Sequence, residues 1–188
     1  MMRIIAGSAK GRNLAAVAGT TRPTSDRARE AMFSTLTSEF GEFQSLNFLD
    51  LFAGSGAVAL EALSRGATIV HAVEKDESAT KTIRANQEIV EKSKPEGKFQ
   101  LYSMSAQKFL ANKSGTYDII FMDPPYEFSD QGIYELLDLI LKNDFLKSGG
   151  VIAIERSSKG AKIKWPKPIT ELRTKEYGVA TLYYGLMP

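Results

Sequence analysis

Residues 46–64 read LNFLDLFAGSGAVALEALS: an apolar run, a glycine-rich turn and a second apolar run in direct succession. The first run, Leu46 to Phe52, has the length and composition of a buried strand, and the second, Ala57 to Ser64, predicts a helix that Gly66 ends. Between them Gly54 to Ala59 fits G-x-G-x-x-[GA], in which glycine permits a tight turn and lets a ligand approach the backbone. The stretch therefore predicts the first strand, turn and helix of an α/β fold with a ligand at the turn.

The rest of the chain continues this alternation, which is typical of βαβ units and a parallel sheet. Further strands are expected at residues 68–73, 99–102, 117–122 and 150–155, and helices at residues 26–39, 76–90, 106–111 and 132–142. Two later strand-like runs, residues 171–176 and 179–186, flank Gly178 and predict an antiparallel pair at a sheet edge. Upstream, residues 4–6 and 12–14 could form a small hairpin, and Thr24 or Ser25 could cap the helix at 26–39. We expect a three-layer α/β domain, residues 41–188, with a basic N-terminal extension, residues 1–40.

Composition narrows the functional classes. The 188 residues are 43% hydrophobic and 24% charged, as is usual for one globular domain. With no cysteine and one histidine, His71, the chain cannot form disulfides or a thiolate or multi-histidine metal site, so we expect no metal. No apolar stretch approaches the ~18 residues of a membrane span, and the N-terminus lacks the apolar segment of a signal peptide. The expected location is the cytoplasm, without membrane contact.

Two acids near the glycine turn indicate the charge of its ligand. Glu74 closes the second predicted strand about 20 residues after the turn, where an acid can accept hydrogen bonds from ribose hydroxyls. Asp50 lies four residues before Gly54, at the carboxyl end of the first strand. A carboxylate there would repel the pyrophosphate of a dinucleotide, because charges couple strongly in a partly desolvated crevice. The order of residues favours a cationic cosubstrate, S-adenosylmethionine, over NAD. Alternatively, Glu74 is a solvated strand end, and the turn binds no ligand.

A second constellation, Asp123-Pro124-Pro125-Tyr126, follows the predicted strand at 117–122, so that it and the glycine turn are both expected at the carboxyl ends of strands, where a bound methyl donor and an acceptor base could meet. The amino group of a nucleobase is a poor nucleophile, because its lone pair is delocalised into the ring. Hydrogen bonds accepted by a carboxylate and a backbone carbonyl can direct that lone pair at a methyl group, and prolines hold such acceptors in place. Tyr126 offers a ring on which a base can stack, an interaction worth roughly 1 to 3 kcal/mol. These four residues are the predicted catalytic group; alternatively, the prolines only end the strand and Tyr126 packs on the sheet.

Basic residues concentrate at the N-terminus, where residues 1–29 hold six basic side chains and one acid, Asp26. Such residues interleaved with glycine can bind phosphates, and Arg22 and Arg29 could each form a two-pronged contact with one. The alternative is a solvated charged helix. The predicted RNA-binding residues are Arg3, Lys10, Arg12, Arg22 and Arg27.

The segments RIIAGSAKGR, RPT-x-DR-x-RE-x-x-F, DLFAGSGAVALEALSRGA, VEKD and DPPY occur in an order that resembles the RsmD family over essentially the whole chain. The resemblance implies a class I methyltransferase with a Rossmann-like, mostly parallel seven-stranded sheet. It also implies transfer of a methyl group from S-adenosylmethionine, leaving S-adenosylhomocysteine, to guanine N2 of 16S rRNA. The substrate would be naked rRNA or a partly or fully assembled bacterial small subunit, and the protein a monomer.

The same resemblance implies site residues. Arg22, Pro23, Thr24, Arg27, Arg29 and Glu30 would close the donor pocket and face the rRNA, and Asp123 to Tyr126 would receive a flipped guanine. Many relatives have an acid after the third strand that contacts the adenine amino group; this chain has none there, and Ser105 or the backbone of Ala106 would serve instead. The full set expected at the methyl donor is Asp50, Phe52, Ala53, Gly54, Ser55, Gly56, Glu74, Lys75, Ser105, Ala106, Asp123, Arg22, Thr24, Arg29 and Glu30.

Other functions are compatible with parts of the pattern. An adenine-N6 methyltransferase acting on DNA or RNA uses a similar Asp-Pro-Pro-Tyr group, although 188 residues leave little room for a separate DNA-recognition domain. A non-catalytic RNA-binding assembly factor could keep the fold without the chemistry, but Asp50, Glu74 and Asp123 are all intact. A dehydrogenase is disfavoured by the charge at the turn. His71, Trp165 and residues 157–168 suggest no function.

Overall fold

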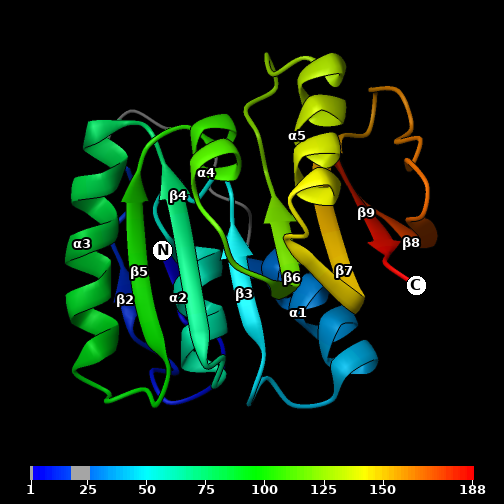
Figure 1. Ribbon diagram of the computed structural model, residues 1–188. Helices are drawn as coiled ribbons and strands as arrows, with labels where there is room; N and C mark the ends of the chain where they lie inside the picture. The colour runs from blue at the N-terminus through cyan, green and yellow to red at the C-terminus, as the bar shows by residue number, and fades with distance from the viewer. Residues whose placement is uncertain (1, 18–25) are drawn as a thin grey trace.

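A seven-stranded sheet forms the centre of the computed structural model, which describes residues 2–17 and 26–188 (Figure 1). The strand order is β5-β4-β3-β6-β7-β9-β8, and a separate two-stranded sheet pairs β1 with β2. The strands are β1 (Met2–Arg3), β2 (Asn13–Leu14), β3 (Asn47–Asp50), β4 (Ile69–Glu74), β5 (Lys98–Ser103), β6 (Tyr117–Met122), β7 (Leu146–Ser157), β8 (Thr170–Tyr177) and β9 (Ala180–Leu186).

Five helices cover the two faces of the sheet, and two buried clusters show how they divide. Apolar side chains of α1, α2 and α3 pack against one face, and those of α4 and α5 against the other (Figure 1). The helices are α1 (Asp26–Phe40), α2 (Ala57–Ser64), α3 (Glu77–Glu91), α4 (Ala106–Asn112) and α5 (Asp130–Lys142). The expected three-layer α/β architecture is confirmed. None of these helices in the described part of the chain is long and apolar enough to cross a membrane.

The central strands are parallel and buried on both faces. In β6, Ile119, Ile120, Phe121 and Met122 are at most 1% exposed, and successive side chains alternate between the two clusters. Such continuous apolar runs are typical of a parallel sheet that helices cover on both sides. The parallel strands β3, β4, β5, β6 and β7 end at one edge of the sheet, which we call the carboxyl rim.

The last two strands in the lateral order of the sheet are antiparallel: β7 pairs antiparallel with β9, and β9 with β8. The expected antiparallel edge is therefore confirmed. The strand expected at residues 150–155 is longer, because β7 begins at Leu146. Leu146 pairs with Tyr117, and Lys147 Nζ lies 2.8 Å from Asp118 Oδ2. A register shift between Tyr117 and Ile119 accommodates this extra segment. The sequence pattern did not predict it, because Gly149, which has a positive φ of 76°, interrupts the strand pattern.

The expected N-terminal hairpin forms, but its strands are short: β1 precedes the expected range 4–6, and β2 lies within the expected range 12–14. Met2 pairs with Leu14 and Arg3 with Asn13, the Ile4 N–H donates to the Arg12 carbonyl over 2.9 Å, and the two residues after Ile4 bind α2. The N–H groups of Ile5 and Ala6 donate to the buried Glu61 carboxylate over 2.7 and 3.0 Å. These long-range bonds replace the strand pairing that local sequence predicts. The cap expected at Thr24 or Ser25 lies outside the described residues.

The extension shares its core with the sheet. Met2, Ile4 and Leu14 from the hairpin and Met32, Phe33 and Leu36 from α1 belong to the cluster that contains Phe48 of β3. The Arg65 guanidinium also lies 4.6 Å from the centre of the Phe33 ring. The boundary after residue 40 stays a prediction.

Two glycines of the hairpin provide a matched test of its packing on α2. Gly7 (φ 83°) and Gly11 (φ 84°) both adopt the left-handed conformation, but a Cβ at Gly7 would lie 1.7 Å from the Ser64 carbonyl oxygen, whereas one at Gly11 would meet nothing within 4 Å. We expect Gly11→Ala to lower the free energy of unfolding by about 1 to 2 kcal/mol, the conformational cost alone. Gly7→Ala should lose roughly 1 to 3 kcal/mol more, because the backbone must move. Urea unfolding of both variants measures the difference, and equal losses would contradict this packing.

Candidate active site

Two loops meet at the carboxyl rim, one after β3 and one after β6. Asp50 pairs with Phe121 in adjacent parallel strands, and the Leu51 N–H donates to the Phe121 carbonyl over 3.0 Å. Beyond the strands, the rings of Phe52 and Phe128 meet edge to face with their centres 5.3 Å apart. The structure therefore brings the glycine turn and the Asp123–Tyr126 segment together, as the sequence predicts.

The glycine turn has the backbone that its sequence requires. Gly54 (φ 53°) and Gly56 (φ 79°) are both left-handed, and Gly56 caps α2. A Cβ at Gly56 would crowd Ile83 of α3 at 3.3 Å, so this glycine allows the helices to pack closely. A Cβ at Gly54 would meet nothing within 4 Å, so the backbone there is open to a ligand. The two glycines therefore serve packing and access, respectively.

Glu74 holds the glycine turn against the end of β4. Its Oε2 accepts a hydrogen bond from the Gly54 N–H over 2.9 Å, and its Oε1 accepts from Lys75 and Asp76 over 2.8 and 2.9 Å. A carboxylate offers about four acceptor positions, so three are occupied by backbone. The sequence suggested a ribose ligand for Glu74 and missed this structural role. The ribose contact stays a prediction for the remaining position.

Asp50 is a buried acid at the centre of the site. Burial is the largest cause that raises its pKa, to about 8; the charges of Asp123 and Glu74 contribute to the increase, and hydrogen bonds from the Phe52 and Ala59 N–H groups oppose it. The Phe52 N–H donates to Oδ1 over 3.3 Å, and the whole residue is 1% exposed. Asp50, Glu74 and Asp123 thus form a group of interacting carboxylates at the rim, an environment that favours a positively charged ligand.

The loop after β6 presents its aromatic ring outward. Pro124 is buried, whereas Pro125 is exposed and Tyr126 is 52% exposed. The Phe128 N–H donates to the Pro125 carbonyl over 2.9 Å, which closes a tight turn beside Tyr126. The alternative in which Tyr126 packs on the sheet is therefore wrong.

Of the remaining residues expected near the donor, Ser105 and Ala106 lie at the start of α4. Ser105 caps this helix, its Oγ accepting from the Lys108 N–H over 3.3 Å, and Ala106 is buried. Both follow β5 at the carboxyl rim, but no contact shows that they replace the missing acid. Lys75 is exposed and binds Glu74 only through its backbone N–H. Their roles toward a donor stay predictions.

The N-terminal basic residues are dispersed. Arg3, Arg12 and Arg27 are exposed, as is Glu30. Lys10 is exposed, and the N–H of the preceding residue, Ala9, donates to Ser64 Oγ. Ser64 is the last residue of α2, whereas the glycine turn lies at the first residue of this helix. The structure therefore does not bring Lys10 to the carboxyl rim. Arg22 and Thr24 lie outside the described residues.

Arg29 differs from both interpretations of the sequence. Its side chain is fully buried, and Nη2 donates to the Arg3 carbonyl and, over 3.0 Å, to Asp26 Oδ1. It is neither part of a solvated helix face nor positioned to form a fork onto an RNA phosphate, because burial prevents that contact. A role in closing the donor pocket stays a prediction. Among the described residues, no three histidine or acidic side chains are grouped to hold a metal ion.

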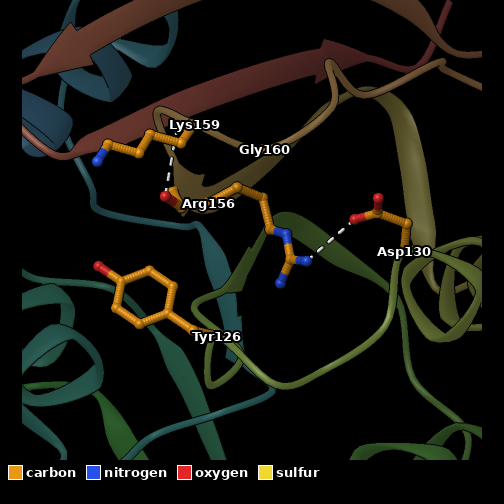
Figure 2. A pocket seen from close by; sticks show the side chains of 6 residues that line it. Tyr126, Asp130, Arg156, Lys159 and Gly160 are labelled. Carbon is orange, nitrogen blue, oxygen red and sulfur yellow. Dashed lines mark hydrogen bonds and ion pairs between the residues drawn. The ribbon is translucent and has the colours of Figure 1, made fainter.

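A pocket that the sequence did not suggest opens beside Tyr126, with a volume of about 340 Å³ (Figure 2). It is lined by Tyr126, Asp130, Arg156, Ser157, Lys159 and Gly160. The last four residues span the end of β7 and the turn after it, where a parallel strand reaches the rim. That position is the one signal that could have marked them.

Replacing Asp50 by asparagine tests its buried, protonated state. Between its ordinary pKa of 3.8 and the folded value of about 8, the folded protein binds a proton that the unfolded chain releases. The free energy of unfolding must therefore fall as pH rises through this window, with a limiting slope of roughly 1 to 2 kcal/mol per pH unit. We expect Asp50→Asn to lose this slope, so that it gains stability relative to the parent protein between pH 5 and pH 8. Urea unfolding at several pH values measures this difference, and the control is Asp138→Asn, which changes an exposed aspartate of α5. Parallel curves for parent and Asp50→Asn would contradict the account.

Comparison with known proteins shows the family to which the chain belongs. The Haemophilus influenzae protein named Ribosomal RNA small subunit methyltransferase D is 31% identical over 96% of this chain and 91% of its own. YlbH of Bacillus subtilis is 37% identical over 95% of both chains. The solved structure of yhhF from Escherichia coli is 31% identical, covers 99% of this chain and 98% of its own, and superimposes with a TM-score of 0.83. These matches bear out the Rossmann-like class I fold. The family model described as Conserved hypothetical protein 95 matches residues 2–185, and the chain belongs to this family of RsmD-type methyltransferases.

Proposed function

We propose that the protein transfers a methyl group from S-adenosylmethionine to the exocyclic N2 amine of a guanine in bacterial 16S rRNA. The observation that supports this most is the buried Asp50 between Glu74 and Asp123, where two loops meet at the carboxyl rim. A relative named for small-subunit rRNA methylation, 31% identical over nearly the whole chain, supports the substrate class.

The residues at the rim fit the proposed donor. S-adenosylmethionine supplies a methyl group bound to a positively charged sulfur. The carboxylates of Asp50, Glu74 and Asp123 offer negative charge to that sulfonium and to the α-ammonium group. The open backbone at Gly54 leaves space for close approach, and Glu74 keeps one acceptor position for a ribose hydroxyl.

The residues of the β6–α5 loop account for the acceptor. Asp123, two residues beyond the strand pair of Asp50, would accept a hydrogen bond from the guanine amine and direct its lone pair at the methyl carbon. On transfer, a nitrogen–carbon bond would form as the carbon–sulfur bond breaks. The electron pair of the broken bond would stay on sulfur, and the nitrogen would release one proton to solvent. Tyr126, which is 52% exposed, would stack on the extruded base. Holding the reactants in line can supply several kcal/mol of the rate enhancement.

RNA would approach over the rim. The exposed Arg3 and Arg27 would supply positive charge on the N-terminal elements. Lys10 and Arg12 lie in one turn, in which the Arg12 N–H donates to the Ala9 carbonyl over 3.1 Å, and they would contribute only if the RNA reaches past the end of α2. The substrate would be free rRNA or a partly assembled subunit in the cytoplasm, and the protein would act as a monomer.

The direct test is incubation with labelled methyl donor and unmodified small-subunit rRNA, either free or bound by ribosomal proteins. We expect label in one nucleoside, identified by mass spectrometry as N2-methylguanosine. Label in N6-methyladenosine would replace the proposed base. Binding of rRNA with no transfer in either arm would indicate a non-catalytic assembly factor.

Asp123 variants test the role of the acceptor. We expect Asp123→Ala to lower the rate of methyl transfer at least about 100-fold, because a side chain positioned to accept a hydrogen bond or proton from the reacting group contributes on that order. Calorimetry should show that this variant still binds S-adenosylhomocysteine. Asp123→Asn should keep part of the rate, since its amide oxygen still accepts a hydrogen bond. Glu127→Ala, an exposed acid four residues on, is the control and should match the parent protein. An Asp123→Ala variant with full activity would refute the assignment.

A further inference from the structure

We propose that the pocket beside Tyr126 is a phosphate subsite, in which Lys159 binds the RNA backbone next to the target nucleotide and Arg156 holds the adjoining loop. This inference rests on the proposed function and adds the residues that hold the strand. The ligand class is a phosphodiester of single-stranded RNA. Tyr126, the ring expected to stack on the target base, lines this pocket, whereas Arg3, Lys10, Arg12 and Arg27, the described basic residues expected to bind RNA, do not.

The position of the pocket supports this assignment. β7 is parallel to β6, and Ile154 pairs with Met122, so Arg156 and the turn after it reach the carboxyl rim beside Asp123–Tyr126. The pocket is thus one strand further along the same rim than the candidate active site. An RNA strand whose base stacks on Tyr126 would place its neighbouring phosphate within this region.

The charges of the pocket favour an anion. Arg156 is 11% exposed, and its Nη2 donates to the Phe128 carbonyl over 2.9 Å and to Asp130 Oδ1 over 3.0 Å. Asp130 therefore offsets Arg156, and the ammonium of Lys159 remains: no carboxylate in residues 2–17 or 26–188 lies within 4.0 Å of it. In Figure 2 the side chains of Lys159 and Tyr126 both extend away from the Arg156–Asp130 pair. The exposed part of the pocket thus combines one uncompensated cation with one aromatic ring.

Hydrogen bonds to the β8–β9 hairpin hold the turn that carries Lys159. The Ser158 N–H donates to the Val179 carbonyl over 2.9 Å, and Ser158 Oγ donates to the Gly178 carbonyl over 3.1 Å. Within the turn, the Gly160 N–H donates to the Ser157 carbonyl over 2.9 Å. These bonds fix the turn against the β8–β9 hairpin, so that Lys159 is presented at the pocket on a braced backbone.

Arg156 has a second role, because it joins the subsite to the active-site loop. Its bond to the Phe128 carbonyl restrains the loop, and the Phe128 ring also contacts the Phe52 ring. A phosphate beside Lys159 would therefore bind next to a loop that two contacts hold at Phe128. The pocket and Tyr126 adjoin through this loop.

The experiment measures binding of unmodified small-subunit rRNA by Lys159→Gln, Lys159→Arg and Lys162→Gln across a range of salt concentrations. Lys162 is an exposed lysine in the same connecting segment that does not line the pocket, and it is the matched control. Loss of one phosphate contact makes the salt slope less negative by about 0.7 and weakens binding about fourfold at ~0.15 M salt. We expect these changes for Lys159→Gln, and the parent values for Lys159→Arg and Lys162→Gln. S-adenosylhomocysteine affinity should be unchanged in all three.

An unchanged salt slope for Lys159→Gln, or equal changes for Lys159→Gln and Lys162→Gln, would overturn the subsite. So would Lys159-dependent binding of a polyglutamate peptide without any such dependence for RNA. If the parent protein binds rRNA through Lys159 but transfers no methyl group, the subsite stands and the proposed enzymatic function fails. The two proposals are therefore tested separately.

Discussion

The parallel pairing of β3 with β6 is the constraint on which the site depends. These strands are distant in the sequence but adjacent in the sheet, with Asp50 opposite Phe121. Their carboxyl ends therefore carry the glycine turn and the Asp123–Tyr126 segment to one place, the crevice where open α/β sheets bind ligands. The Phe52–Phe128 contact extends this pairing beyond the strands. Each motif alone could be an ordinary loop, and only the strand order joins them.

The rim also shows how a fold can select a ligand by charge. The Glu74 carboxylate accepts hydrogen bonds from three backbone N–H groups. Asp50 is instead buried, and burial raises its pKa to about 8. An acid that is protonated in the absence of ligand carries little repulsion during folding, and a cation would favour its ionised form. The cost of burying this acid is thus offset when a positively charged donor binds.

The sequence predicted the features that depend on local pattern. Every major strand and helix was expected near its observed position, and β6 at Tyr117–Met122 was expected with the same bounds. Asp50 and Asp123 were expected at the same edge because each follows or ends a predicted parallel strand, and parallel strands have their carboxyl ends at one edge of a sheet. Features that depend on distant contacts were missed: the hairpin residues that bind Glu61, the burial of Arg29 with its bond to the Arg3 carbonyl, and the pocket at Lys159. No spacing along the chain encodes the neighbour that buries an arginine or braces a turn.

A crystal structure of the protein with S-adenosylhomocysteine would show directly whether the glycine turn and the Asp123–Tyr126 loop form one site. We expect the α-ammonium group near Asp50, the ribose near Glu74, and the sulfur facing Asp123 across the β3–β6 junction. A product molecule bound with its sulfur directed away from the Asp123–Tyr126 loop, or bound elsewhere on the protein, would contradict it.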